Sequence, residues 1–250
     1  DQMHGRPVAE RLAEYERQVR IFQDQFAGRT LTTRHHCLTW VGYTDVVEVQ
    51  ERLGIRMDAN FTGGPACFRH LEPGPYFGFG AAMPMRFCRL DGQLLKVFQQ
   101  HTHVEDDMWF GAQIAYSLKL SPAVYQVVWD RMLDDAIRRF HTPLGLNIHP
   151  SNWVKFSGLQ GRHTLSAAVS RGVPIWSFDR WCEFWQARDG WRITHSAWNG
   201  SEFDVRLEGP TGHPDLRAWV PMRYGDRSLA ELRLHGNVLP LKTIVRYGET

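Results

Sequence analysis

Long apolar runs, clustered charge and closely spaced CxxC cysteines are all missing from this sequence. Its 250 residues contain no uninterrupted apolar stretch near the roughly 18 to 20 residues that a transmembrane helix needs. Lysine and arginine number 29 against 27 for aspartate and glutamate, and the charges are interspersed, which argues against a surface that follows a phosphate backbone. We therefore expect neither a membrane span nor a nucleic-acid partner.

The four cysteines lack the CxxC spacing of zinc ribbons and thioredoxin-like dithiols. Cys67 and Cys88 could pair in an oxidising compartment, and buried thiols are an equal alternative. Aromatic and imidazole groups are plentiful instead, with 10 tryptophans and 12 histidines. Aromatic faces stack on sugar rings or fill cores, and imidazoles bind metals or transfer protons near neutral pH.

Hydrophobic periodicity predicts alternating helices and strands over residues 1–188. The predicted helices are residues 7–27, 45–53, 121–141, 165–170 and 179–188. The predicted strands are residues 30–35, 55–60, 85–90, 93–100, 144–148 and 173–178. Asp91-Gly92 predicts a hairpin turn, while the other strands alternate with helices as in a parallel α/β fold.

Beyond a boundary near Asp189 the pattern changes to short β-prone runs separated by glycine-containing turns. The predicted strands here are residues 203–207, 216–220, 229–234 and 243–247. We expect residues 189–250 to form a small antiparallel β module.

Polar residues at the carboxyl ends of the predicted parallel strands are the candidates for a functional site, because the loops that follow such strands gather on one face. His149 stands out, since it lies between a buried strand and a proline. Asp58 has a structural alternative as a loop cap, and His101 and His103 could form a metal pair or lie in solvent beside acidic residues. The full set of candidates is His4, Arg34, His35, His36, Asp58, His101, His103, Asp106, Asp107 and His149.

Three segments that contain some of these candidates resemble motifs of a known family. Arg34-His35-His36-Cys37-Leu38-Thr39-Trp40, then Leu53-Gly54-Ile55-Arg56-Met57-Asp58, and finally Leu146-Asn147-Ile148-His149-Pro150 resemble motifs of the polysaccharide deacetylase superfamily. The run from Val173 to Trp176 and the following Phe184 to Arg188 are similar to its closing strand and helix. The resemblance covers residues 1–188 and implies a distorted (β/α) barrel.

The resemblance also implies roles for individual residues. Arg34 would orient the catalytic base, His149 would be the general acid, and Asp106 or Asp107 would hold that histidine, with Asp107 our choice. A divalent metal, zinc in this family, would take His4 as a ligand. The expected substrate contacts are His36, Trp40, Asp58 and Trp109.

Two departures from the family pattern accompany the resemblance. His36 and Leu38 stand where the family usually has proline and glycine, so the floor of the pocket must differ. The family's two early aspartates have no match, which predicts that the first strands precede Asp1.

The resemblance implies hydrolysis of an N-acetyl or O-acetyl group on a carbohydrate. It also implies an extracellular or periplasmic location, because the family acts on polymers. Two alternatives stay open. One is a barrel that binds saccharides without hydrolysing them. The other is a glycoside hydrolase or lyase that uses paired carboxylates such as Asp58 and Asp107.

Overall fold

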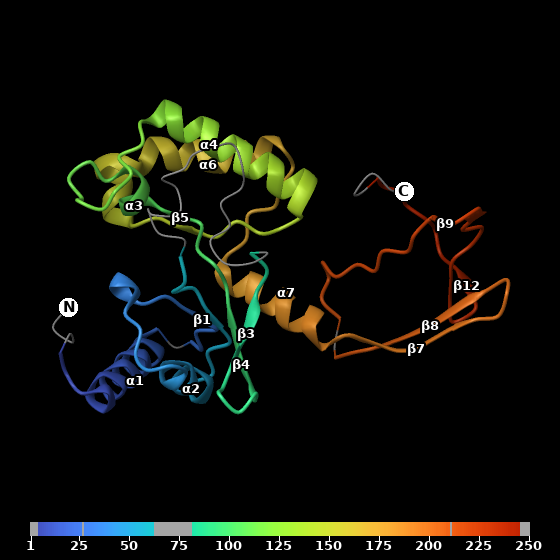
Figure 1. Ribbon diagram of the computed structural model, residues 1–250, viewed down its shortest axis with the longest axis horizontal. Helices are drawn as coiled ribbons and strands as arrows, with labels where there is room; N and C mark the ends of the chain where they lie inside the picture. Colours follow the sequence, from blue (N-terminus) through green and yellow to red (C-terminus); the bar gives the residue numbers. More distant parts are fainter. Residues whose placement is uncertain (1–4, 27, 63–81, 211, 246–250) are drawn as a thin grey trace.

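The computed structural model describes residues 5–26, 28–62, 82–210 and 212–245. Figure 1 shows an α/β body followed by an extended C-terminal segment. The helices are α1 Val8–Gln25, α2 Asp45–Arg52, α3 Asp106–Phe110, α4 Pro122–Asp135, α5 Pro150–Asn152, α6 Gly158–Ser170 and α7 Phe178–Gly190. The strands of the body are β1 Thr32–Thr33, β2 Met57–Asp58, β3 Met85–Cys88, β4 Leu94–Gln99, β5 Val104–Glu105 and β6 Leu146–Asn147. The mixed α/β prediction is confirmed.

Parallel strands that follow one another in chain order form the frame of the body. β1 pairs with β2, β2 pairs with β4, and β5 pairs with β6, each time in parallel. β5 follows β4 after residues 100–103, and within that link Thr102 makes a further parallel bridge to Thr62. The carboxyl ends of β1, β2, β5 and β6 therefore point the same way, as the expected site requires.

The predicted hairpin is confirmed by β3 and β4, which are antiparallel neighbours. Gly92 has φ +87° in the connecting turn, a backbone conformation that glycine adopts without strain. The hairpin adds an antiparallel edge to the sheet, whose order is β1-β2-β4-β3.

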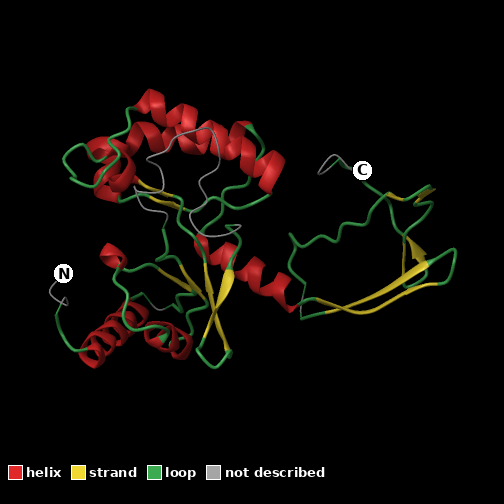
Figure 2. Cartoon of the chain, viewed as in Figure 1, coloured by secondary structure: helices red, strands yellow, loops and turns green. Residues whose placement is uncertain are grey.

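Helices cover both faces of this four-stranded sheet. On one face Leu95 and Val97 pack against Val46 and Val47 of α2. On the other face Met57 and Phe98 of the strands form a cluster with Cys182 and Trp185 of α7. Figure 2 shows the strands lying between the helical groups.

A barrel would fill its inner face with side chains from the strands themselves. Because α7 covers that face of the sheet, the described residues form no closed barrel, and the sequence-based expectation of one is not met. A separate core under α3, α4 and α6 is built around Trp109, Tyr125 and Trp129.

The strand predicted for residues 173–178 is absent. Val173 donates its backbone N–H to Ala168 O at the end of α6, and Ile175 is half exposed, so this run lies at the surface and leads into α7. Its β-branched residues favour a strand, but no strand pairs with this run among the described residues.

The C-terminal segment contains only strands and loops among its described residues (Figure 2). It forms three antiparallel hairpins, from β7 Arg192–Trp198 with β8 Phe203–Glu208, β9 Arg223–Tyr224 with β10 Arg227–Ser228, and β11 Arg233–Leu234 with β12 Asn237–Val238. β8 matches a predicted strand, whereas residues 216–220 are irregular, residues 229–234 supply only the two residues of β11, and residues 243–245 form no strand. β7 was not predicted. Antiparallel hairpins in this part of the chain are nevertheless confirmed.

No helix in the described part of the chain is long and apolar enough to cross a membrane.

The C-terminal segment contacts α7 through an ion pair between Arg180 Nη2 and Asp215 Oδ2 at 2.9 Å. Phe184 and His213 add an edge-on ring contact at 5.6 Å between centroids.

The α1/α2 core gives a direct test of the packing. Ile55 is fully buried in a cluster with Val19, Val49 and Leu53. We expect Ile55→Ala to lower the free energy of unfolding by about 2–5 kcal/mol, because it removes buried methyl groups and leaves a cavity. Urea denaturation measures this. Leu90→Ala, at a side chain that is 89% exposed, should change stability by less than about 0.5 kcal/mol, and equal losses in both variants would contradict the packing.

Candidate functional site

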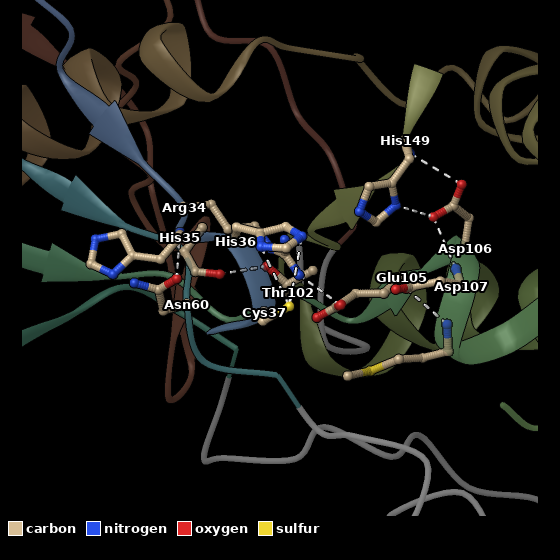
Figure 3. Close-up of polar contacts among 12 residues, drawn as sticks. Arg34, His35, His36, Cys37, Asn60, Thr102, Glu105, Asp106, Asp107 and His149 are labelled. Carbon is tan, nitrogen blue, oxygen red and sulfur yellow. Dashed lines mark hydrogen bonds and ion pairs between the residues drawn. The ribbon is translucent and has the colours of Figure 1, made fainter. Parts of the chain in front are cut away.

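A fully buried carboxylate, that of Asp106, holds His149 at the carboxyl edge of β5 and β6 (Figure 3). Asp106 Oδ1 lies 2.6 Å from His149 Nδ1 and accepts the backbone N–H of Asp107 at 2.9 Å. Asp106 Oδ2 accepts the backbone N–H of His149 at 3.1 Å and the hydroxyl of Ser157 at 3.0 Å. Four donors thus satisfy both oxygens, and the imidazole ring is fixed in direction.

Local sequence explains how these groups meet. Asp106 directly follows β5 and opens α3, and His149 follows β6. Pro150 begins α5, and a residue before proline is driven to extended backbone, as the ψ of +129° at His149 shows. Ser157 enters from the turn that precedes α6. His149 and Ser157, 43 and 51 residues beyond Asp106 in the sequence, therefore converge on its carboxylate.

The contacts define which imidazole atom remains available. Asp106 Oδ1 already acts as an acceptor for a backbone N–H, so His149 Nδ1 is the donor in the 2.6 Å contact. The His149 side chain is 37% exposed while that of Asp106 is fully buried. His149 Nε2 is the ring atom left to exchange a proton or to bind a metal.

Asp106, Asp107 and His149 also form a group that could hold a metal ion. Each offers one ligand atom, and these atoms lie within 4.8 Å of one another. Carboxylate oxygens and imidazole nitrogens are ligands that divalent ions use in proteins. Asp107 is half-buried; its Oδ1 accepts the N–H of Met108, and its Oδ2 lies 3.5 Å from the hydroxyl of Tyr116.

A second charged pair lies beside this group. Arg34 Nη2 is 2.6 Å from Glu105 Oε2, and the two side chains are 20% and 3% exposed. Arg34 follows β1 and Glu105 ends β5, so the pair joins two strand ends at the carboxyl edge of the frame. The ion pair that the structure gives Arg34 is with Glu105, whereas the resemblance implied a contact with the catalytic base.

Of the two adjacent histidines, His36 lies on the site side. It opens a short 3₁₀ turn, His36–Leu38, and is exposed, with Cys37 Sγ 3.5 and 3.6 Å from its two ring nitrogens. The His35 ring points away from His149 in Figure 3. His35 Nδ1 lies 2.7 Å from Thr39 O, and its ring packs on Tyr15.

The remaining predicted substrate contacts are placed in the interior. Asp58 is fully buried and accepts hydrogen bonds from Gln50 Nε2 at 2.6 Å and from the backbone and side chain of Asn60 at 2.8 and 2.9 Å. Burial raises the pKa of the Asp58 carboxyl. Trp109 is 2% exposed and packs edge-on against Tyr125.

Trp40 is half-buried among aromatic rings and donates its indole N–H to Tyr43 O at 3.2 Å. The predicted metal ligand His4 lies outside the described residues, as does Cys67.

His101 and His103 are buried in the structure, so the alternative that placed them in solvent is wrong. Their ring centroids are 4.7 Å apart, and burial lowers their pKa values to about 4 and about 3. Gly145 N donates to His103 Nδ1 at 2.9 Å, which requires a neutral ring that carries its proton on Nε2.

Sequence reasoning missed Ser157 and gave no role to Glu105. Ser157 carries no sequence signal because it is an isolated serine far from any predicted strand end. Glu105 directly precedes the two aspartates, so its place at a strand end was readable, but its partner across the frame was not.

Comparison with protein-family models, with curated proteins and with solved structures finds no match to this chain in any of the three.

The ion pair of Arg34 and Glu105 predicts a stability effect. Arg34→Met leaves a buried, unpaired carboxylate, so we expect the free energy of unfolding to fall by about 3–5 kcal/mol. The double variant Arg34→Met/Glu105→Gln removes both charges and should recover most of that loss. Urea denaturation of the single and double variants checks this, and a double variant no more stable than Arg34→Met would contradict a direct pair.

Burial of His101 and His103 predicts acid sensitivity. Both pKa values lie below the ordinary 6.5, so only the unfolded chain takes up these protons as the pH falls from about 6.5 toward 4. The two histidines therefore make stability fall over that window. In His101→Gln we expect a shallower fall, measured as unfolding free energy against pH. His195→Gln, at a side chain 54% exposed, is the matched control and should keep the wild-type slope.

Proposed function

We propose that this chain is a metal-dependent hydrolase that removes acetyl groups from a carbohydrate. The observation that carries the proposal is the 2.6 Å contact between buried Asp106 and half-exposed His149 at the carboxyl edge of parallel strands. A histidine fixed by a buried carboxylate is a common general acid or base. The motif resemblance supplies the substrate class.

In the proposed reaction, a carboxylate base takes one proton from a water molecule while the oxygen of that water attacks the acetyl carbonyl, and the bond from that carbon to the sugar nitrogen or oxygen then breaks. His149, as imidazolium, gives its Nε2 proton to the leaving nitrogen or oxygen. Asp106 holds the ring through Nδ1 and stabilises its charged form. Ser157 holds Asp106 in turn and is a positioning residue.

The metal in this proposal is zinc. Asp107 is the described side chain best suited to bind it, because both Asp106 oxygens already accept two hydrogen bonds each. The resemblance adds His4. A zinc ion would supply Lewis-acid polarisation of the acetyl carbonyl and of the attacking water.

The alternative of a carboxylate pair finds less support. It needs Asp58 and Asp107 to face each other across a cleft with room for a sugar. Asp58 is instead enclosed by Gln50 and Asn60, which donate three hydrogen bonds to it.

Product analysis tests the proposed reaction. The chain is incubated with zinc and with N-acetylated chitin oligomers or O-acetylated xylan, and released acetate and new reducing ends are measured. We expect acetate without new reducing ends. Reducing ends without acetate would overturn the proposal in favour of a glycosidase, and binding of the oligomers with neither product would leave a saccharide-binding protein.

His149→Ala should lower the rate of acetate release by about two to four orders of magnitude, because general acid catalysis is lost. Zinc content after dialysis, measured by elemental analysis, should stay at the wild-type level. His163→Ala is the matched control, because His163 on α6 also pairs with an aspartate, Asp130 on α4, with 3.2 Å between Nε2 and Oδ1. This variant should keep full activity. An unchanged rate in His149→Ala would contradict the acid role, and loss of zinc in that variant would make His149 a ligand.

A further inference from the structure

The hairpin of β7 and β8 projects beyond α7 with no helix over it (Figure 1). Every residue of both strands is exposed. One face of this ribbon is apolar, and its larger side chains, 38–68% exposed, are Ile193, Trp198, Phe203, Val205 and Leu207. A two-stranded ribbon is only marginally stable by itself, and further strands that extend an apolar face stabilise it.

The outer edge of β8 offers unpaired backbone groups. Asn199 N donates to Glu202 O at the hairpin end, so hydrogen-bonded and non-hydrogen-bonded pairs alternate from there. Trp198 and Phe203 form the next, non-hydrogen-bonded pair. It follows that the N–H and C=O groups of Phe203, Val205 and Leu207 point away from β7. β8 has β7 as its one partner strand among the described residues.

The side chains along β8 are complementary to a second, reversed copy of β8. With a two-fold axis at Val205, antiparallel pairing places Phe203 opposite Leu207 on the apolar face. On the other face it places Asp204 opposite Arg206, twice, and Glu202 opposite Glu208, whose own cross-strand partner on β7 is Arg192. Asp204 is 80% exposed and makes only a long ion contact, 3.9 Å to His195, among the described residues.

We propose that two copies of this chain associate through β8, which pairs with itself in antiparallel fashion about Val205 to build a four-stranded sheet. Opposite charges across strands stabilise such pairs, and like charges destabilise them. A shift of the axis by one residue would set Asp204 or Arg206 against its own copy. Such a shift would also set Leu207 against Ser201 or Phe203 against Gly209 in place of an apolar partner, so the apolar pairs favour this register.

Charge reversal on the full chain tests the surface. Light scattering after size exclusion should give about twice the 29.0 kDa chain mass for the wild type. Asp204→Arg and Arg206→Asp should each give the single-chain mass, because each sets like charges opposite one another. The double variant Asp204→Arg/Arg206→Asp restores opposite charges and should restore the dimer. Asp226→Arg, the same change in the exposed β9–β10 turn, is the control and should stay dimeric.

A cross-link provides the second measurement. In this register the two Val205 Cα atoms face each other within the range that a disulfide spans. Val205→Cys should therefore form a covalent dimer on oxidation, seen on a non-reducing gel, while Asp226→Cys and the wild type should not. A monomeric wild type, a double variant that stays monomeric, or no cross-link through residue 205 would each overturn the proposal.

Discussion

The carboxylate of Asp106 is the constraint on which the site depends. A buried carboxylate is costly unless donors replace the water that it has lost. Four donors do so here: two backbone N–H groups, one imidazole and one hydroxyl. They come from the start of α3, the end of β6 and the turn before α6, so these segments cannot separate without exposing or orphaning the charge. The strand ends are thereby held in register with one another.

Asp106 and His149 have different roles in this arrangement. Asp106 is saturated and inaccessible, so it acts through the ring that it holds. His149 is half exposed, and one of its nitrogens is occupied, so its chemistry is confined to Nε2. Arg34 and Glu105 extend the same pattern across the frame, since each neutralises the other at a neighbouring strand end. At the carboxyl edge, the buried carboxylates of Asp106 and Glu105 thus each have a partner, and the ring of His149 beside them is reached by solvent.

Much of the frame could be predicted from sequence, because periodicity and turn chemistry are local. The features predicted in this way are helices α1, α2 and α4, the β3–β4 hairpin, and the strand ends before Arg34 and His149. The family resemblance, and not local periodicity, implied that Asp106 or Asp107 holds His149. Our choice of Asp107 is wrong, because Asp106 makes that contact and Asp107 accepts the N–H of Met108 instead. What failed depends on distant contacts. Asp58 lies at a strand end as predicted, yet Gln50 of α2 covers it. Residues 173–178 have β-branched side chains and no partner strand, and α7 packs on the sheet face that a barrel would enclose.

The most direct measurement is the nitrogen-15 NMR spectrum of the histidine rings, with the His149 signals assigned by comparison with His149→Gln. The account predicts that neutral His149 carries its proton on Nδ1, donated to Asp106, and that the Asp106→Asn variant loses this preference. A neutral His149 ring that carries its proton on Nε2 in the wild type would contradict the account. It would mean that Nδ1 does not donate a hydrogen bond to Asp106.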